Sequence, residues 1–245
     1  MEFGFYLPTH GPLATRQNLL KISEHAEKLE FDSMVAGDHV IAPINPTSQY
    51  PYSVGSEVPW DSSGEHLEMI TELAFLAAAT QKIKLVTSVM IVPHRNPILT
   101  AKMLSTLDVL SEGRLVVGIG VGWLKEEFEA LEIPFSERAA RTEESVQAIR
   151  SLWGAETSSF DGKFYRWGAL ESYPKPVQPG GVPILVGGHV EGAARRAARV
   201  GDGFFPAGGG DLQELSQLLA AMRDECGKIG RDPSEIEITV GALPK

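Results

Sequence analysis

The sequence predicts an α/β fold built on a parallel sheet, because two kinds of segment alternate along it. Short apolar runs typical of strands are followed by longer segments whose apolar residues recur at helical spacing. Strands that alternate with helices pair in parallel, since each crossover to the next strand needs a helix. This pattern leaves two architectures, a doubly wound sheet and an α/β barrel. A length of 245 residues is ordinary for such a barrel.

Seven strands are expected from the short apolar runs. They fall at 3–7, 33–37, 83–92, 115–119, 184–186, 203–205 and 236–240. Because eight strands close a barrel, the final strand and its helix would be missing from this chain. We therefore expect the parent protein to continue beyond Lys245, or a partner or a rearrangement to cover the gap.

Helices are expected between the strands. In the first of them, Leu19, Ile22, Ala26 and Leu29 fall at helical spacing, so one apolar face would pack on the sheet. The expected helices cover about 17–30, 67–80, 99–110, 146–153, 190–200 and 215–222.

Two inserts interrupt the alternation. The segment 41–66 is rich in Pro and Ser, and the segment 154–181 carries aromatic residues and several prolines. Long inserts in compact domains are commonly lids or binding loops, so both are expected to be lids. No low-complexity linker divides the chain, and residues 1–245 are therefore expected to form a single domain.

Composition excludes several classes of partner. The net charge of −10 argues against nucleic acid, whose phosphates need a surplus of Lys and Arg. It also means that a site for an anionic cofactor must collect its positive charge locally. No apolar run approaches the roughly 20 residues of a membrane helix, and Met1 opens no basic signal sequence. The single cysteine, Cys226, fits a reducing compartment, so a cytoplasmic protein without a membrane partner is expected.

Candidate chemistry lies just after the strands, because ligands of parallel α/β folds bind at the carboxyl ends of the strands. Asp38 and His39 follow the second strand. Imidazole titrates near neutrality, so His39 could exchange a proton with a substrate. A turn-capping Asp beside a surface His fits the same positions equally well. His94, which follows the third strand, is the competing candidate.

Two further strand ends carry polar residues or glycines. After the third strand, the Ser88 hydroxyl could bond a ligand and Arg95 could pair with an anion, although a strand end and a helix start explain this segment as well. After the fourth strand, Gly120 and Gly122 would let the backbone approach a planar or phosphorylated ligand beside Trp123. A tight loop without ligand contact is the alternative, and a Rossmann fingerprint fits poorly.

After the fifth strand, Gly187 and Gly188 lead into a predicted helix that carries Arg195 and Arg196. Small residues at a helix N-terminus leave amide N–H groups available for an anion, and a plain glycine turn is the rival interpretation. The six histidines show no metal-binding spacing, so no metal site is expected. Walker A and serine-hydrolase motifs are also absent from the sequence.

Taken together, these segments resemble the luciferase-like monooxygenase superfamily, and most of all its deazaflavin (coenzyme F420)-dependent oxidoreductase branch. The resemblance spans nearly the whole chain. It is carried by the segments 29–39, 87–97, 107–123, 126–138, 174–178, 184–188 and 201–204.

The resemblance implies a (β/α)8 TIM barrel, here lacking its final βα unit, with a flavin or deazaflavin ring over the strand ends. In relatives that oxidise alcohol-like carbons, a His matching His39 is thought to exchange the substrate proton. The peptide between Ser88 and Val89 is expected to be cis and to bulge against the ring. The remaining residues expected to bind the cofactor are Asp38, Gly120, Gly122, Trp123, Gly187 and Gly188, the last two at its phosphate, with Arg95, Arg195 or Arg196 as possible local charge.

The function implied is transfer of a hydride between coenzyme F420 and a small organic substrate, by a homodimer. Some alcohol-oxidising relatives carry a Glu beside the ring where this chain has Trp123, so reduction of a C=C or C=O bond, or oxygenation, is comparably expected. The alternatives are an FMN-dependent monooxygenase using reduced flavin and oxygen, a non-catalytic flavin-binding barrel, and a phosphate-binding barrel isomerase or lyase.

Overall fold

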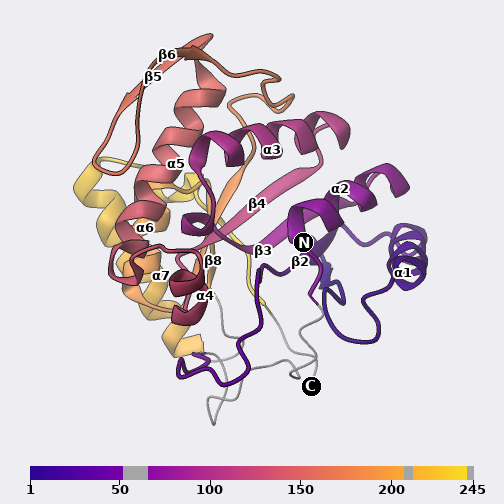
Figure 1. Ribbon diagram of the computed structural model, residues 1–245. Coiled ribbons are helices and arrows are strands. Elements are labelled where there is room, and N and C mark those ends of the chain that lie inside the picture. The colour runs from indigo at the N-terminus through magenta and orange to yellow at the C-terminus, as the bar shows by residue number, and fades with distance from the viewer. Residues whose placement is uncertain (52–65, 207–211, 242–245) are drawn as a thin grey trace.

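The computed structural model describes residues 1–51, 66–206 and 212–241 and shows a curled parallel sheet with helices along its outer face (Figure 1). All seven expected strands are present, in the order β1-β2-β3-β4-β7-β8-β9. The strands are β1 (Gly4–Tyr6), β2 (Ser33–Ala36), β3 (Lys84–Ile91), β4 (Leu115–Gly120), β7 (Ile184–Gly188), β8 (Gly203–Pro206) and β9 (Glu237–Ile238).

Every neighbouring pair in this sheet is parallel. The curl and the strand order are those of an α/β barrel rather than of a doubly wound sheet. Within the described residues β1 and β9 are edge strands, so the sheet forms part of a barrel and does not close. The expected fold is thus confirmed as a partial barrel.

Helices occupy the segments between the strands as the apolar spacing predicts. Their starts are set by side chains that accept from free amide N–H groups: Thr15 caps the first helix and Asn96 caps the third, where Pro97 takes the first helical position. The helices are α1 (Arg16–Lys28), α2 (Met69–Ala79), α3 (Pro97–Leu110), α4 (Lys125–Ala130), α5 (Arg138–Gly154), α6 (Glu191–Val200) and α7 (Leu212–Ile229).

The core lies between the helices and the sheet. Strand residues such as Met34, Leu85 and Leu115 are fully buried there, against Leu73 and Leu104 of the covering helices. These strands are apolar on both faces, as strands that are covered on both sides must be. Short 3₁₀ turns at Val92–His94, Phe135–Glu137 and Pro233–Glu235 complete the connections.

The sequence patterns missed an antiparallel hairpin of β5 (Thr157–Asp161) and β6 (Arg166–Glu171), in which Phe160 stacks on Trp167 at 5.0 Å between ring centroids. The hairpin follows α5 and lies at the end of that helix farthest from α4 (Figure 1). A segment that follows a helix emerges at the amino ends of the strands. The second insert is therefore not a lid over the strand ends, which corrects that expectation.

The first insert lies partly outside the described residues. Its described part, 41–51, runs beside α4: the carboxylate of Glu126 accepts hydrogen bonds from the backbone N–H of Thr47 at 2.6 Å and from the Thr47 hydroxyl at 2.8 Å. The backbone N–H of Ser48 donates to the same oxygen at 3.1 Å. These bonds hold the start of the insert against the carboxyl end of the sheet.

Candidate active site

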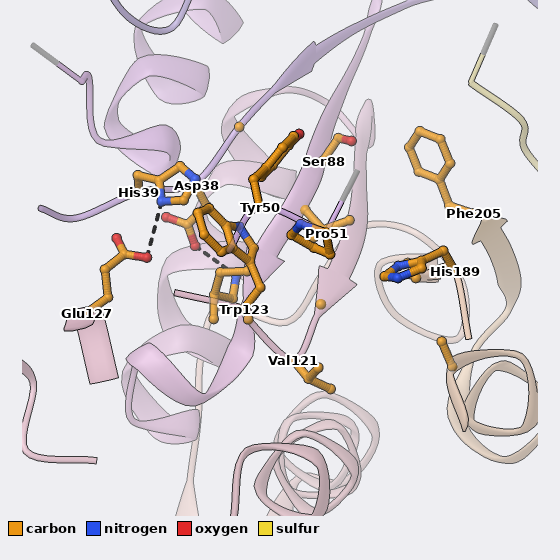
Figure 2. Close-up of a pocket in the computed structure, with 18 of the residues that line it drawn as sticks. Asp38, His39, Tyr50, Pro51, Ser88, Val121, Trp123, Glu127, His189 and Phe205 are labelled. Atoms are coloured by element: carbon orange, nitrogen blue, oxygen red, sulfur yellow. Dashed lines mark hydrogen bonds and ion pairs between the residues drawn. The ribbon is translucent and has the colours of Figure 1, made fainter. Parts of the chain in front are cut away.

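A cavity of about 590 Å³ lies at the carboxyl ends of the strands (Figure 2). This volume is within the range of ordinary ligand pockets. The structure brings nine of the residues proposed from the sequence together at this one cavity, whereas His94, Arg95 and Arg195 do not line it. The nine residues are Asp38, His39, Ser88, Val89, Gly120, Gly122, Trp123, Gly187 and Gly188.

His39 is held by a buried carboxylate that the sequence patterns did not single out. Its Nδ1 lies 3.1 Å from Oε2 of Glu127, whose side chain is 2% exposed. The other oxygen of Glu127 accepts from the backbone N–H of Val40 at 2.8 Å. Burial acts to raise the pKa of Glu127, but these bonds outweigh it and hold the pKa below its ordinary value. Glu127 is therefore ionised and fixes the orientation of the imidazole.

Asp38, the residue before His39, makes different contacts. Its oxygens accept from both terminal nitrogens of Arg95, at 2.6 and 2.8 Å, and from the backbone N–H of Ile91 at 2.8 Å. Arg95 also donates to Glu68 at 3.0 Å. Asp38 thus ties the end of β2 to the end of β3, and Arg95 is committed to carboxylates. This corrects the expectation that Arg95 supplies charge to a bound anion.

The peptide between Ser88 and Val89 is cis, as expected, and the β3–β4 register shifts at this point. The side chain of Val89 fills the space above two glycines. A Cβ on Gly120 would lie 2.5 Å from one Val89 methyl, and a Cβ on Gly187 would lie 2.6 Å from the other. The lack of a side chain at these two glycines therefore makes room for Val89.

Three histidines gather at one end of the cavity, which we call the imidazole end: His10, His39 and His66. The ring centroids of His10 and His66 are 4.9 Å apart, and those of His66 and His39 are 5.6 Å apart. Burial, reinforced by the other two imidazoles, lowers the pKa of His66 to about 4. The His66 ring is consequently uncharged at neutral pH.

The other end, which we call the arginine end, is lined by Arg138, Arg196 and His189. Arg196 is buried, and its Nε lies 3.2 Å from Glu143 without hydrogen-bond alignment. Its pKa is lowered, first by burial, with the positive charge of Arg138 among the further causes. Within the described residues no carboxylate forms an ion pair with Arg138, which donates to the carbonyls of Gly122 and Phe135.

The arginine end also receives the start of α6. No side chain caps this helix at Val190, and Gly188 precedes it with a φ of 142°. Free amide N–H groups and two cations here suit an anion. Arg196 lines the cavity, as the expected role at an anion requires. Arg195 does not line it, because it pairs with Glu191 and Asp224 on the helix surface.

The rival proton carrier, His94, does not line the cavity. It is buried against Phe128 at 4.7 Å between ring centroids, and neither ring nitrogen has a hydrogen-bond partner. Burial lowers its pKa. His94 is thus a core residue, and His39 is the histidine of the pair that reaches the cavity.

Several cavity residues escaped the sequence interpretation. His10 follows β1, so inspection of that strand end would have found it. Glu127 and Arg138 stand near the starts of α4 and α5, and Tyr50 and His66 both lie in the first insert, where no pattern marks them. These residues reach the cavity through contacts between segments that are far apart in the sequence.

The described part of the chain contains neither a candidate metal cluster nor a candidate membrane span. Among the described residues, no group of three or more His, Cys, Asp or Glu side chains could hold a metal ion. Over the same part of the chain, no helix is long and apolar enough to cross a membrane.

Comparisons with known proteins agree with the geometry. The family model for luciferase-like monooxygenases matches residues 1–244. An F420-dependent glucose-6-phosphate dehydrogenase of Segniliparus rotundus is 34% identical over 229 residues, which cover 90% of this chain and 62% of the relative.

Two solved structures are similar along nearly the whole chain. The crystal structure of monooxygenase RslO1 from Streptomyces bottropensis has a TM-score of 0.79 at 30% identity, covering 98% of this chain and 70% of that one. An F420-dependent secondary alcohol dehydrogenase in complex with an F420–acetone adduct has a TM-score of 0.79 at 22% identity, covering 98% and 68%, which shows a shared fold. The chain therefore belongs to the luciferase-like monooxygenase family.

Proposed function

We propose that this protein is an oxidoreductase that transfers a hydride between coenzyme F420 and a small organic substrate. The observation that carries the proposal is the His39–Glu127 pair at the carboxyl end of the sheet, facing the cavity. The F420-dependent dehydrogenase at 34% identity supports the choice of cofactor.

The cavity fits such a cofactor in two respects. Its volume suits a multi-ring ligand, and its arginine end offers charges and amide groups for a phosphate. Ser88, Val89, Gly120, Gly122 and Trp123 would hold the ring. Gly187, Gly188, Arg138 and Arg196 would hold the phosphate, while Asp38 would keep the strand ends in register. When bound, the deazaflavin or flavin ring would accept or supply the hydride.

His39 would handle the proton that accompanies the hydride. A carboxylate only accepts hydrogen bonds, so Nδ1 of His39 carries a hydrogen directed at Glu127 and Nε2 is the nitrogen that exchanges the substrate proton. In either direction, hydride transfer at carbon is matched by a proton on the neighbouring oxygen or carbon. The ionised Glu127 stabilises the imidazolium that forms when His39 takes this proton.

A second candidate is an FMN-dependent monooxygenase that uses reduced flavin and oxygen. It is favoured by the 30% identity to monooxygenase RslO1. Trp123 also stands where some alcohol-oxidising relatives carry a Glu. A non-catalytic flavin-binding barrel is the alternative of another class, and the His39–Glu127 pair argues against it.

The deciding experiment is a titration of the apo-protein with F420 and with FMN. We expect F420 to bind more tightly than FMN, and submicromolar binding of FMN without binding of F420 would favour the second candidate. Single-turnover oxidation of bound, reduced F420 by a ketone such as 1-tetralone, without oxygen, then tests the chemistry.

The same single-turnover assay tests the role of His39. His39→Ala should slow turnover by about 10²- to 10⁴-fold, as the loss of a general acid–base group does. His94→Ala is the matched control, because that imidazole does not reach the cavity. A normal rate in His39→Ala with a collapse in His94→Ala would move the proton to His94.

A further inference from the structure

Five rings form a continuous wall at the imidazole end of the cavity. In order they are Tyr50, Trp123, His39, His66 and His10, with centroid separations of 5.2, 6.1, 5.6 and 4.9 Å. The first three contacts are edge-to-face. All five residues line the cavity, and Figure 2 shows Tyr50, Trp123 and His39 on one side of Ser88 with His189 on the other.

The charge at this end is unlike that at the arginine end. The carboxylate of Glu127 stands behind His39, and the His66 ring is uncharged at neutral pH. The described Lys and Arg side chains that line the cavity are Arg138 and Arg196, both on helices of the arginine end. No described Lys or Arg belongs to the ring wall, so a phosphate bound along it would lack the cationic side chain that phosphates prefer.

The wall suits flat, uncharged molecules. Aromatic faces and edges attract other rings in offset or edge-to-face contact, and such contacts add to the burial of apolar area. Two hydroxyl groups can orient a ligand in the cavity. The Tyr6 hydroxyl and Ser88 Oγ lie 3.3 Å apart, and both residues line the cavity. These hydroxyls offer donors and acceptors to a polar atom of a ligand in the cavity, as His39 does.

We propose that the substrate is an uncharged ring compound bearing a carbonyl or hydroxyl group, bound along the ring wall with its oxygen toward His39. This inference rests on the proposed function in one respect, the assignment of the arginine end to the cofactor phosphate. The proposed substrate class differs from glucose 6-phosphate, the substrate in the name of the Segniliparus rotundus relative.

The test measures binding, independently of turnover. The full chain is titrated with 1-tetralone, 1-tetralol, 2-cyclohexen-1-one and glucose 6-phosphate, with and without saturating F420, by isothermal calorimetry or ligand-observed NMR. We expect at least one of the three ring compounds to bind with a Kd below 1 mM and glucose 6-phosphate to bind at least tenfold more weakly.

Variants then locate the binding. Tyr50→Leu should weaken binding of the ring compound by about 3- to 10-fold through lost ring contact. Tyr165→Leu is the matched control, since it removes a tyrosine from the β5–β6 hairpin, outside the cavity, and should leave binding unchanged. F420 affinity and melting temperature, measured on each variant, report whether the arginine end and the fold are intact.

Three outcomes would overturn the proposal: glucose 6-phosphate binding as tightly as the ring compounds, no ring compound binding below 1 mM, or equal affinity in Tyr50→Leu and the parent chain. The failure of the proposed function looks different. In that case neither F420 nor FMN would bind, while titration of the cofactor-free protein would still show whether Tyr50 holds a ring compound.

Discussion

The two ends of the cavity are built from different kinds of chain segment. The imidazole end is carried by loops and by the insert before α2, whereas Arg138 and Arg196 of the arginine end stand on helices α5 and α6. Helices packed on a core fix side chains more firmly than loops do, and loops tolerate change in sequence. The difference indicates a fixed end for a shared cofactor and an adaptable end for a particular substrate.

The largest effect should come from the imidazole end. Glu127→Gln keeps the shape of the side chain but removes the charge that stabilises a protonated His39, so single-turnover rates should fall by about 10- to 100-fold. F420 affinity should change less than twofold. Glu129→Gln is the control, because Glu129 is exposed, pairs with Lys125 and does not line the cavity. Equal rates in both variants would refute the positioning role of Glu127.

The arginine end should instead govern affinity. Arg196→Met or Arg138→Met removes a charged donor from the expected phosphate site, and loss of such a bond costs about 1.5–3 kcal/mol, or about 10- to 100-fold in the Kd for F420. Turnover at saturation should change little. Arg195→Met, on the same helix but outside the cavity, should bind F420 normally. A slower turnover of Arg196→Met at saturating F420 would contradict the assignment of the arginine end to cofactor affinity alone.

Substitutions at the residues that pack against Val89 should have coupled effects on the free energy of unfolding. Gly187→Ala or Gly120→Ala forces a methyl group against the Val89 side chain and should lower the free energy of unfolding by about 1–3 kcal/mol. The double variant Gly120→Ala with Val89→Ala should recover part of that loss. Thermal unfolding measures both, and no recovery would mean that the strain lies elsewhere.

Glu72, on α2 and outside the cavity, is a buried carboxylate whose surroundings differ from those of Glu127. Both carboxylates are buried, but neither oxygen of Glu72 has a hydrogen-bond partner, and burial raises its pKa from 4.5 to about 7. The folded protein then holds a proton that the unfolded chain releases, so stability falls as the pH rises from about 4.5 to 7.

This linkage predicts the behaviour of Glu72→Gln. The neutral amide removes the cost of the buried charge, so the variant should gain about 1–2 kcal/mol over the parent chain at pH 8 and gain little at pH 5. Urea unfolding at the two pH values is the measurement. Equal gains at both would show that burial of charge is not the cause.

The sequence predicted the strands because each is a short apolar run, and the runs of β2, β3, β4, β7 and β8 are largely buried. It missed the β5–β6 hairpin because that segment is largely exposed and carries no apolar alternation. The strand-end rule located Asp38 and His39 correctly, but it could not assign them different roles. That distinction depends on Arg95 and Glu127, which are 57 and 88 residues away along the chain.

The packing of Val89 has a consequence for the evolution of this chain. Three positions on β3, β4 and β7 share one small volume, so a larger residue at 120 or 187 is tolerated only with a smaller residue at 89. Positions 89, 120 and 187 should therefore change together among homologues, although no two of them are near one another in sequence. A library randomised at these three positions should return survivors whose summed side-chain volume is nearly constant, and substitutions at one position alone should be rare.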